Sequence, residues 1–277
     1  LEAFRKAVLH FGGQGVAGIE RKPLLPTAVD EGLGVFSGSW AVPGREGEGW
    51  SIIARNDHSA LVHWFTYDEH GAARWLSGLA TRSGNLLAGR LISIRSNDDD
   101  GGEDWGGFAF TLANCNTLRI NLRADHAPPR NVQRVARRIS GLDGLPCTQG
   151  SGHMPGLQAG QSGLWNTDEP SLGALLLHMV AEDRGLAYEL TFDEDGQPTW
   201  SLGSGPLENG ETLRLERFAP SGLRPGDALD PAEFELAPLA TLELKFLGCG
   251  SAQGLVPATG ERLTLQRTLT PHGLTCP

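Results

Sequence analysis

Long apolar runs are missing from this 277-residue sequence, and none approaches the roughly eighteen residues that a membrane-spanning helix requires. Cysteine is scarce: there are four, and none forms the C-x-x-C pair that is typical of thiolate metal sites. The chain also lacks the G-x-S-x-G elbow of many hydrolases and the H-E-x-x-H motif of zinc proteases. We therefore expect no membrane span, no bound metal, no cofactor and no catalytic site of those kinds.

Positive charge is in the minority. The formal net charge is −10 and the pI is near 5.3, which argues against nucleic acid or an anionic membrane surface as a partner. The chain begins at Leu1, without an initiator Met, and residues 1–8 are too short and too polar for the core of a signal peptide. We expect a mature exported protein, extracellular or periplasmic, with enough residues for two domains of ordinary size.

What the sequence does contain is one pattern that occurs twice. Residues 37–40 (SGSW) return as 162–165 (SGLW), and residues 66–71 (TYDEHG) return as 191–196 (TFDEDG). Trp75 returns as Trp200, and all three pairs are 125 positions apart. A constant spacing of this kind predicts a duplicated structural unit. The expected organisation is an N-terminal arm at 1–34, repeat one at 35–147, a linker at 148–160 and repeat two at 161–277.

Each repeat reads as a series of short strands separated by turn residues, which indicates an all-β fold. In residues 60–67, Leu61, His63, Phe65 and Tyr67 share one face of a strand, and the residues between them share the other. Helical periodicity is confined to residues 1–10. The sequence predicts two tandem antiparallel β-barrels or β-sandwiches of like topology. We expect strands at residues 50–54, 60–67, 73–80, 86–95, 108–112, 117–122 and 132–139, and again at 175–180, 186–192, 199–203, 212–218, 241–246 and 262–269.

The cysteines follow the duplication. Four cysteines allow three pairings, and the repeat favours one disulfide in each unit, Cys115–Cys147 and Cys249–Cys276. A four-thiolate zinc site is the alternative. Disulfides would place the protein in an oxidising compartment.

Three histidines, His58, His63 and His70, fall on one predicted hairpin. Their positions in repeat two carry Asp183, Tyr188 and Asp195, so we interpret them as surface histidines rather than as a metal site. The acidic loop at 98–104 is interpreted as solvated rather than calcium-binding, because it lacks the EF-hand pattern. The G-x-G-x-x-G match at residues 13–18 is followed by prolines rather than by a helix, and we assign it to the arm.

Acidic pairs precede the glycine of the repeated turn in both units, Asp68 with Glu69 and Asp193 with Glu194. Their place beside glycine fits turn formation better than paired catalytic carboxylates.

Tryptophan supplies the remaining clue. Trp40/Trp165 and Trp75/Trp200 occur in both copies and are expected in the core, whereas Trp50 becomes Leu175 and Trp64 becomes Glu189. A core position needs an apolar replacement, so we expect Trp64 to face solvent or a partner; the alternative is that another element covers it. The predicted binding residues are Trp64, Trp50 and His63.

The residues SGSW (37–40), GEGW (47–50), WFTYD (64–68), Gly71, Trp75 and GLPC (144–147) resemble a repeat of exported gammaproteobacterial proteins, often found beside secreted enzymes. The resemblance covers residues 35–147 and 161–276, and it implies export without an assigned activity. Repeat two departs from it at Pro170 and Glu189. The G-x-W opening also resembles the first strand of calycin barrels, which include avidins, lipocalins and bacterial metalloprotease inhibitors.

The function expected from the sequence is an exported, non-catalytic binding or assembly module with a protein or glycan partner in the cell envelope or extracellular space. Self-association through the arm at 1–34 is a further expectation. One alternative is a secreted enzyme with a site between the domains, using residues such as His63, Asp68 or His178. Another is an inhibitor of a secreted hydrolase.

Overall fold

The computed structural model describes residues 32–45, 47–96, 102–125, 131–147, 156, 158–168, 173–221 and 234–275. The predicted helix at 1–10, the glycine-rich motif at 13–18 and nearly all of the arm lie outside the described residues. Within the described part of the chain, no helix combines the length and the apolar character needed to cross a membrane.

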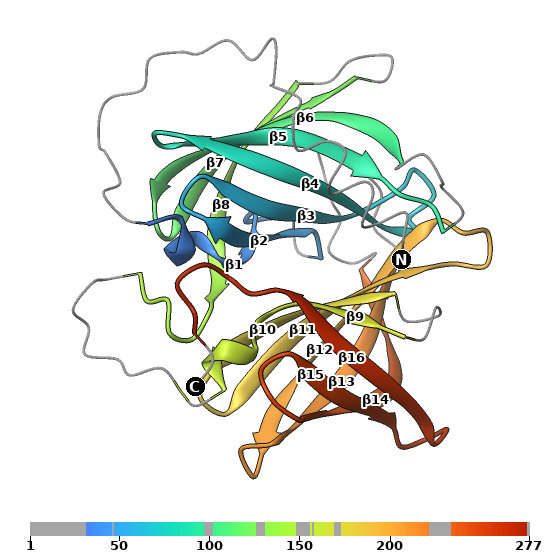
Figure 1. Cartoon of the computed structure of the whole chain (residues 1–277). Coiled ribbons are helices and arrows are strands. Elements are labelled where there is room, and N and C mark those ends of the chain that lie inside the picture. The colour runs from blue at the N-terminus through green and yellow to red at the C-terminus, as the bar shows by residue number, and fades with distance from the viewer. Residues whose placement is uncertain are drawn as a thin grey trace.

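The chain folds into two closed antiparallel β-barrels, which Figure 1 shows stacked on each other, one coloured blue to green and the other yellow to red. Barrel one consists of β1 (Gly38–Ala41), β2 (Gly49–Asn56), β3 (Ser59–Tyr67), β4 (Ala73–Ser83), β5 (Leu86–Ser93), β6 (Glu103–Asn114), β7 (Thr117–Ala124) and β8 (Asn131–Gly141). Barrel two consists of β9 (Gly163–Thr167), β10 (Ala174–Ala181), β11 (Arg184–Phe192), β12 (Pro198–Glu208), β13 (Thr212–Ser221), β14 (Glu235–Phe246), β15 (Ser251–Val256) and β16 (Glu261–Leu269).

Each strand pairs with the next one along the chain, and the last strand of each barrel pairs back with the first. Strands β2, β3 and β4 begin and end 125 positions before β10, β11 and β12. The prediction of two tandem antiparallel β-domains of like topology is therefore confirmed, and both domains are barrels rather than sandwiches. Closure removes the exposed strand edges that an open sheet would have to protect.

Three strands, β1, β9 and β15, were not among those expected, and the sequence of β15 explains its omission. On the buried face of β15, Ala252, Gly254 and Val256 alternate with more exposed residues. Two of these three side chains are very small, so the hydrophobic alternation that marks a strand is weak.

The repeated Ser-Gly-x-Trp motif fixes the start of each barrel. A short 3₁₀ helix precedes it, η2 (Leu33–Phe36) in barrel one and η3 (Ala159–Gln161) in barrel two. The first Trp donates its indole N–H to the carbonyl that ends this helix, Trp40 to Phe36 at 3.1 Å and Trp165 to Gln161 at 3.0 Å.

An arginine from the last strand lies over each of these rings, Arg138 over Trp40 at 5.8 Å and Arg267 over Trp165 at 5.7 Å. The motif glycine has a positive φ, 140° at Gly38, where a Cβ would collide with the Ser140 carbonyl. Gly and Trp recur because each performs the same structural task in both barrels.

Three apolar clusters account for most of the buried hydrophobic residues. One fills barrel one, a second fills barrel two, and the third lies between the barrels. Strand β3 shows how a single strand serves two clusters: Val62 and Trp64 point into barrel one, whereas Leu61, Phe65 and Tyr67 join the cluster between the barrels. The predicted face assignment is confirmed, and both faces are buried.

The segment after each barrel crosses to the other barrel. The Asp143 N–H, after β8, donates to the Met179 carbonyl at 2.7 Å, and the His272 N–H, after β16, donates to the Ala54 carbonyl at 2.8 Å. Met179 and Ala54 are 125 positions apart, so the two contacts are equivalent. The two barrels thus contact each other with approximate twofold symmetry.

The predicted Cys115–Cys147 disulfide is present, with the two Cα atoms 5.4 Å apart. It ties the segment after β8 back to the turn between β6 and β7 of its own barrel. Cys276 lies outside the described residues, and the Cys249–Cys276 bridge remains a prediction.

Candidate functional site

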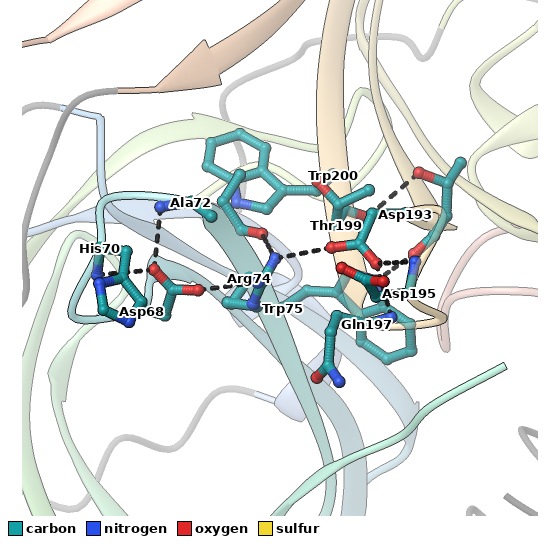
Figure 2. Close-up of polar contacts among 12 residues, drawn as sticks. Asp68, His70, Ala72, Arg74, Trp75, Asp193, Asp195, Gln197, Thr199 and Trp200 are labelled. Carbon is teal, nitrogen blue, oxygen red and sulfur yellow. Dashed lines mark hydrogen bonds and ion pairs between the residues drawn. The ribbon is translucent and has the colours of Figure 1, made fainter.

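The two repeated tryptophans bond across the interface. The Trp75 indole N–H donates to the Thr191 carbonyl at 3.1 Å, and the Trp200 indole N–H donates to the Thr66 carbonyl at 3.2 Å. Figure 2 shows the two indoles on either side of this contact. Both donors and both acceptors are 125 positions apart, so each repeat carries both halves of the interaction. This reciprocity is what an isologous interface between two like units requires.

One cation departs from the symmetry. Arg74 pairs with Asp68 of its own barrel at 2.7 Å and with Asp193 of barrel two at 3.3 Å, and Figure 2 shows it between the two carboxylates. The equivalent of Arg74 in barrel two is Thr199. Because these side chains remain partly exposed, the two ion pairs contribute little to the stability of the interface.

The repeated acidic residues form turns, as predicted. The Asp68 carboxylate accepts the N–H groups of His70 and Ala72, and the Asp193 carboxylate accepts those of Asp195 and Gln197. The glycines that follow have positive φ, 84° at Gly71 and 74° at Gly196. Asp68 was named above as a residue of the alternative enzyme site. Its carboxylate is engaged in the hydrogen bonds of the turn and in the ion pair with Arg74.

A row of polar side chains crosses four neighbouring strands on the face of barrel one that meets barrel two. We call Ser39, Ser51, His63 and Ser77 the polar row. Each residue pairs with the next across the sheet, and all four have 0% exposure.

Barrel two covers the polar row with His178 and Tyr188. The two ring nitrogens of His178 lie 3.0 Å from the Ser39 hydroxyl and 3.1 Å from the Ser51 hydroxyl. The Tyr188 hydroxyl donates to Ser39 at 3.0 Å, and its ring stacks on Phe65 with centroids 4.3 Å apart. A neutral imidazole has one N–H donor and one acceptor nitrogen, so one hydroxyl on each side satisfies His178.

Burial dominates the electrostatics of both histidines. Desolvation, followed by the positive charge of Arg138, lowers the pKa of His178 from 6.5 to about 4. Desolvation, followed by the neighbouring His178, lowers the pKa of His63 to about 3. Both imidazoles are therefore neutral at pH 7.

The structure corrects the interpretation of His63. The sequence placed it on the surface, but it is wholly buried, because the outer face of β3 is covered by barrel two. His58 and His70 are exposed, as predicted. His63 and His178, named together for an interdomain enzyme site, do lie at the same interface, while Asp68 lies elsewhere, in its turn. The polar row places hydroxyls beside an imidazole, but this arrangement has no exposure to solvent in the closed interface.

A second polar group lies at the end of barrel one opposite η2. We call Arg45, Glu48, Trp64, Trp105 and Arg134 the rim cluster. The Glu48 carboxylate accepts bonds from the Trp64 indole N–H at 2.9 Å and from Arg134 at 3.2 Å, and it pairs closely with Arg45. Two arginines therefore share one buried carboxylate at this rim.

Aromatic rings continue the rim cluster into the barrel. Trp64 stacks on Trp50 with centroids 5.0 Å apart, and Trp105 meets Trp64 edge-on at 5.0 Å. Trp105 is half-buried at the rim, whereas Trp64 is 8% exposed and Trp50 is 3% exposed. The expectation that Trp64 faces solvent is wrong; Trp105, which the sequence did not single out, is the more exposed ring.

Barrel two shows why the replacement of Trp64 by Glu189 does not indicate an exposed position. Glu189, the equivalent of Trp64, also points into its barrel and is 4% exposed. It pairs with Arg217 at 2.9 Å and accepts a bond from the Ser201 hydroxyl. A glutamate paired with an arginine thus replaces a tryptophan at an interior position. Arg217 lies on another strand, and the sequence pattern around Glu189 does not reveal this contact.

A surface cavity of about 320 Å³ lies beside β8, where Arg138, Asp143 and Val180 contribute to its lining. Two of its charged side chains hold the chain in place: Arg138 donates to the Val35 and Ser37 carbonyls, and Asp143 accepts from the Gly156 N–H at 2.8 Å. Arg138 and Asp143 therefore have structural roles at this cavity.

Metal ligands are not brought together in the described part of the chain, where no three His, Cys, Asp or Glu side chains form a group that could hold an ion. Of the acidic loop at 98–104, residues 98–101 lie outside the described residues, and Asp104 pairs with Arg90 at 2.6 Å. No protein-family model matches the chain, and a search of curated proteins returns no match.

Proposed function

We propose that this protein is an exported, non-catalytic binding module, and that the rim cluster of barrel one is its contact surface for a protein or glycan partner. The observation that carries the proposal is the concentration of two arginines and two tryptophans at one end of one barrel, of which Trp105 and Arg134 are partly exposed and Arg45 and Trp64 are buried beneath them. Aromatic rings and arginines are the side chains that most often supply binding energy at recognition surfaces.

The difference between the barrels supports this choice. Barrel two has Glu189, Arg217 and Ser201 at the matching interior position, without a tryptophan. The residues common to both repeats build the scaffold, whereas the rim cluster belongs to barrel one alone. The calycin-like G-x-W opening fits the proposal, because in barrel one it anchors the end opposite the rim.

Trp105→Ala tests the proposal, because Trp105 is half-buried and its removal leaves the inner rings in place. Binding is measured to a glycan panel and to proteins of the exported fraction, with Ile139→Ala, which removes a 63% exposed side chain on β8, as the matched control. Loss of binding in Trp105→Ala alone supports the rim cluster, and equal binding by both variants and wild type contradicts it. Trp64→Ala is a poorer test, since a buried cavity at that position costs about 3–5 kcal/mol.

The rival function is an enzyme, and the contact of His178 with Ser39 and Ser51 is the observation that favours it. Its test is labelling of either serine by a fluorophosphonate at pH 7.5. Labelling at Ser39 or Ser51 would overturn the non-catalytic proposal, and the buried geometry predicts none.

A further inference from the structure

The polar row lies within an otherwise apolar interface. Its equivalents in barrel two are Leu164, Leu176, Tyr188 and Leu202, and all four belong to or pack against the cluster between the barrels. A duplicated unit therefore carries a polar surface in one copy and an almost apolar one in the other. The polar surface receives an imidazole, His178, at the position where barrel one has Ile53.

The groups around the two histidines favour the neutral state. His178 on β10 meets Ser39 on β1, Ser51 on β2 and Tyr188 on β11. The charged or titratable groups that act on the pair are the histidines themselves, Tyr188 and Arg138 of β8. Arg138 is cationic at every relevant pH and opposes a second positive charge.

We propose that the interface between the barrels is an acid-sensitive joint, in which protonation of His63 and His178 opens the contact while each barrel stays folded. Opening returns both imidazoles to water, where protonation carries no desolvation cost. The barrels remain folded because their interior clusters contain neither histidine. The acid-sensitive interface does not involve the rim cluster, so it can be tested independently of the proposed binding surface.

The charged groups elsewhere in the interface do not cancel the effect. Arg74 keeps its charge in this pH range. The His272 and Asp57 side chains lie 3.4 Å apart and are 41% and 53% exposed, so this pair contributes little to the contact.

The tryptophans provide a readout that separates opening from unfolding. The indole N–H groups of Trp75 and Trp200 bond across the interface, whereas those of Trp40 and Trp165 bond within single barrels. NMR can measure hydrogen exchange of the four indole N–H groups on the full chain from pH 7.5 to 5, with free indole as the reference at each pH. Exchange at Trp75 and Trp200 reports opening of the interface, and exchange at Trp40 and Trp165 reports unfolding of a barrel. We expect the protection of Trp75 and Trp200 to fall by about 30-fold for each histidine at pH 5, with Trp40 and Trp165 retaining theirs.

The double variant His63→Gln/His178→Gln should remove the pH dependence at Trp75 and Trp200. His70→Gln, which changes a histidine with an 82% exposed side chain, is the matched control and should behave as wild type. The proposal is overturned if all four indoles of the wild type lose protection together, or if Trp75 and Trp200 change no more than Trp40 and Trp165. These wild-type outcomes decide the question even if the double variant folds poorly.

Discussion

Trp75 and Trp200 each donate an indole hydrogen bond to the other barrel, Trp75 to the Thr191 carbonyl and Trp200 to the Thr66 carbonyl. Both rings are almost fully buried, at 1% and 5% exposure. The residue that looks like a core tryptophan in the sequence is therefore a core residue of the interface, not of its own barrel. Its recurrence in both repeats reflects a contact that each unit makes with the other.

Trp75→Phe should lower the free energy of unfolding by about 1–3 kcal/mol, because it keeps an aromatic ring but leaves the buried Thr191 carbonyl without its donor. Trp200→Phe should have a similar effect through the Thr66 carbonyl. Urea unfolding measures both, with Trp105→Phe at the half-buried rim as the control. An unchanged unfolding midpoint in either interface variant would show that the reciprocal bonds contribute nothing.

Glu48→Gln should destabilise the protein by about 3–5 kcal/mol, because it removes the negative partner of two arginines that are largely buried. Glu189→Gln is the matched variant in barrel two, where a single arginine, Arg217, loses its partner. We expect Glu48→Gln to be the more damaging of the two in chemical denaturation. The reverse order would contradict the role of Glu48 as the shared partner of two arginines.

Replacing the pair Cys115 and Cys147 by serine should cost about 4 kcal/mol, since the bridge closes a 32-residue separation and restricts the unfolded chain. The comparison is urea unfolding of this variant and of wild type under oxidising conditions. If reduction with dithiothreitol lowers the stability of the variant as much as that of wild type, then Cys115–Cys147 is not the stabilising bridge.

Acid should destabilise the folded protein through His63 and His178. Their pKa values are about 3 and about 4 in the folded state and 6.5 in the unfolded chain, so below pH 6.5 the unfolded chain binds protons that the folded protein does not. The contribution of the two histidines to the free energy of unfolding is fully present above pH 6.5 and declines as the pH falls toward 4. At pH 5 the loss is about 2 kcal/mol per histidine. Urea unfolding at pH 7.5 and 5 measures the difference, and a protein equally stable at both values would contradict the burial of these groups as neutral imidazoles.

Sequence reasoning located most of the strands because period-two alternation is local. Within residues 60–67 it separated Val62 and Trp64 from Leu61, Phe65 and Tyr67 correctly, and the structure assigns the two sets to different apolar clusters. The fixed spacing of 125 residues likewise predicted like topology, because equivalent residues occupy equivalent strand positions.

The errors at Trp64 and His63 have one origin. Alternation shows which residues share a face but not what covers that face, and contacts between distant strands decide it. Glu189 is tolerated inside barrel two because Arg217, from another strand, neutralises it, and His63 is buried because a second barrel lies on β3. Trp64 was named from the sequence, but its partners in the rim cluster were missed for the same reason, since Glu48 and Arg134 are far apart in the sequence.

The central claim is that the two barrels form one body through their reciprocal interface, and differential scanning calorimetry of the full chain at pH 7.5 tests it most directly. We expect a single transition whose calorimetric enthalpy equals its van't Hoff enthalpy, because at pH 7.5, where both interface histidines are neutral, exposing the shared apolar cluster destabilises either barrel strongly. Two separate transitions, or a calorimetric enthalpy about twice the van't Hoff value, would contradict it, because barrels that unfold independently behave in that way.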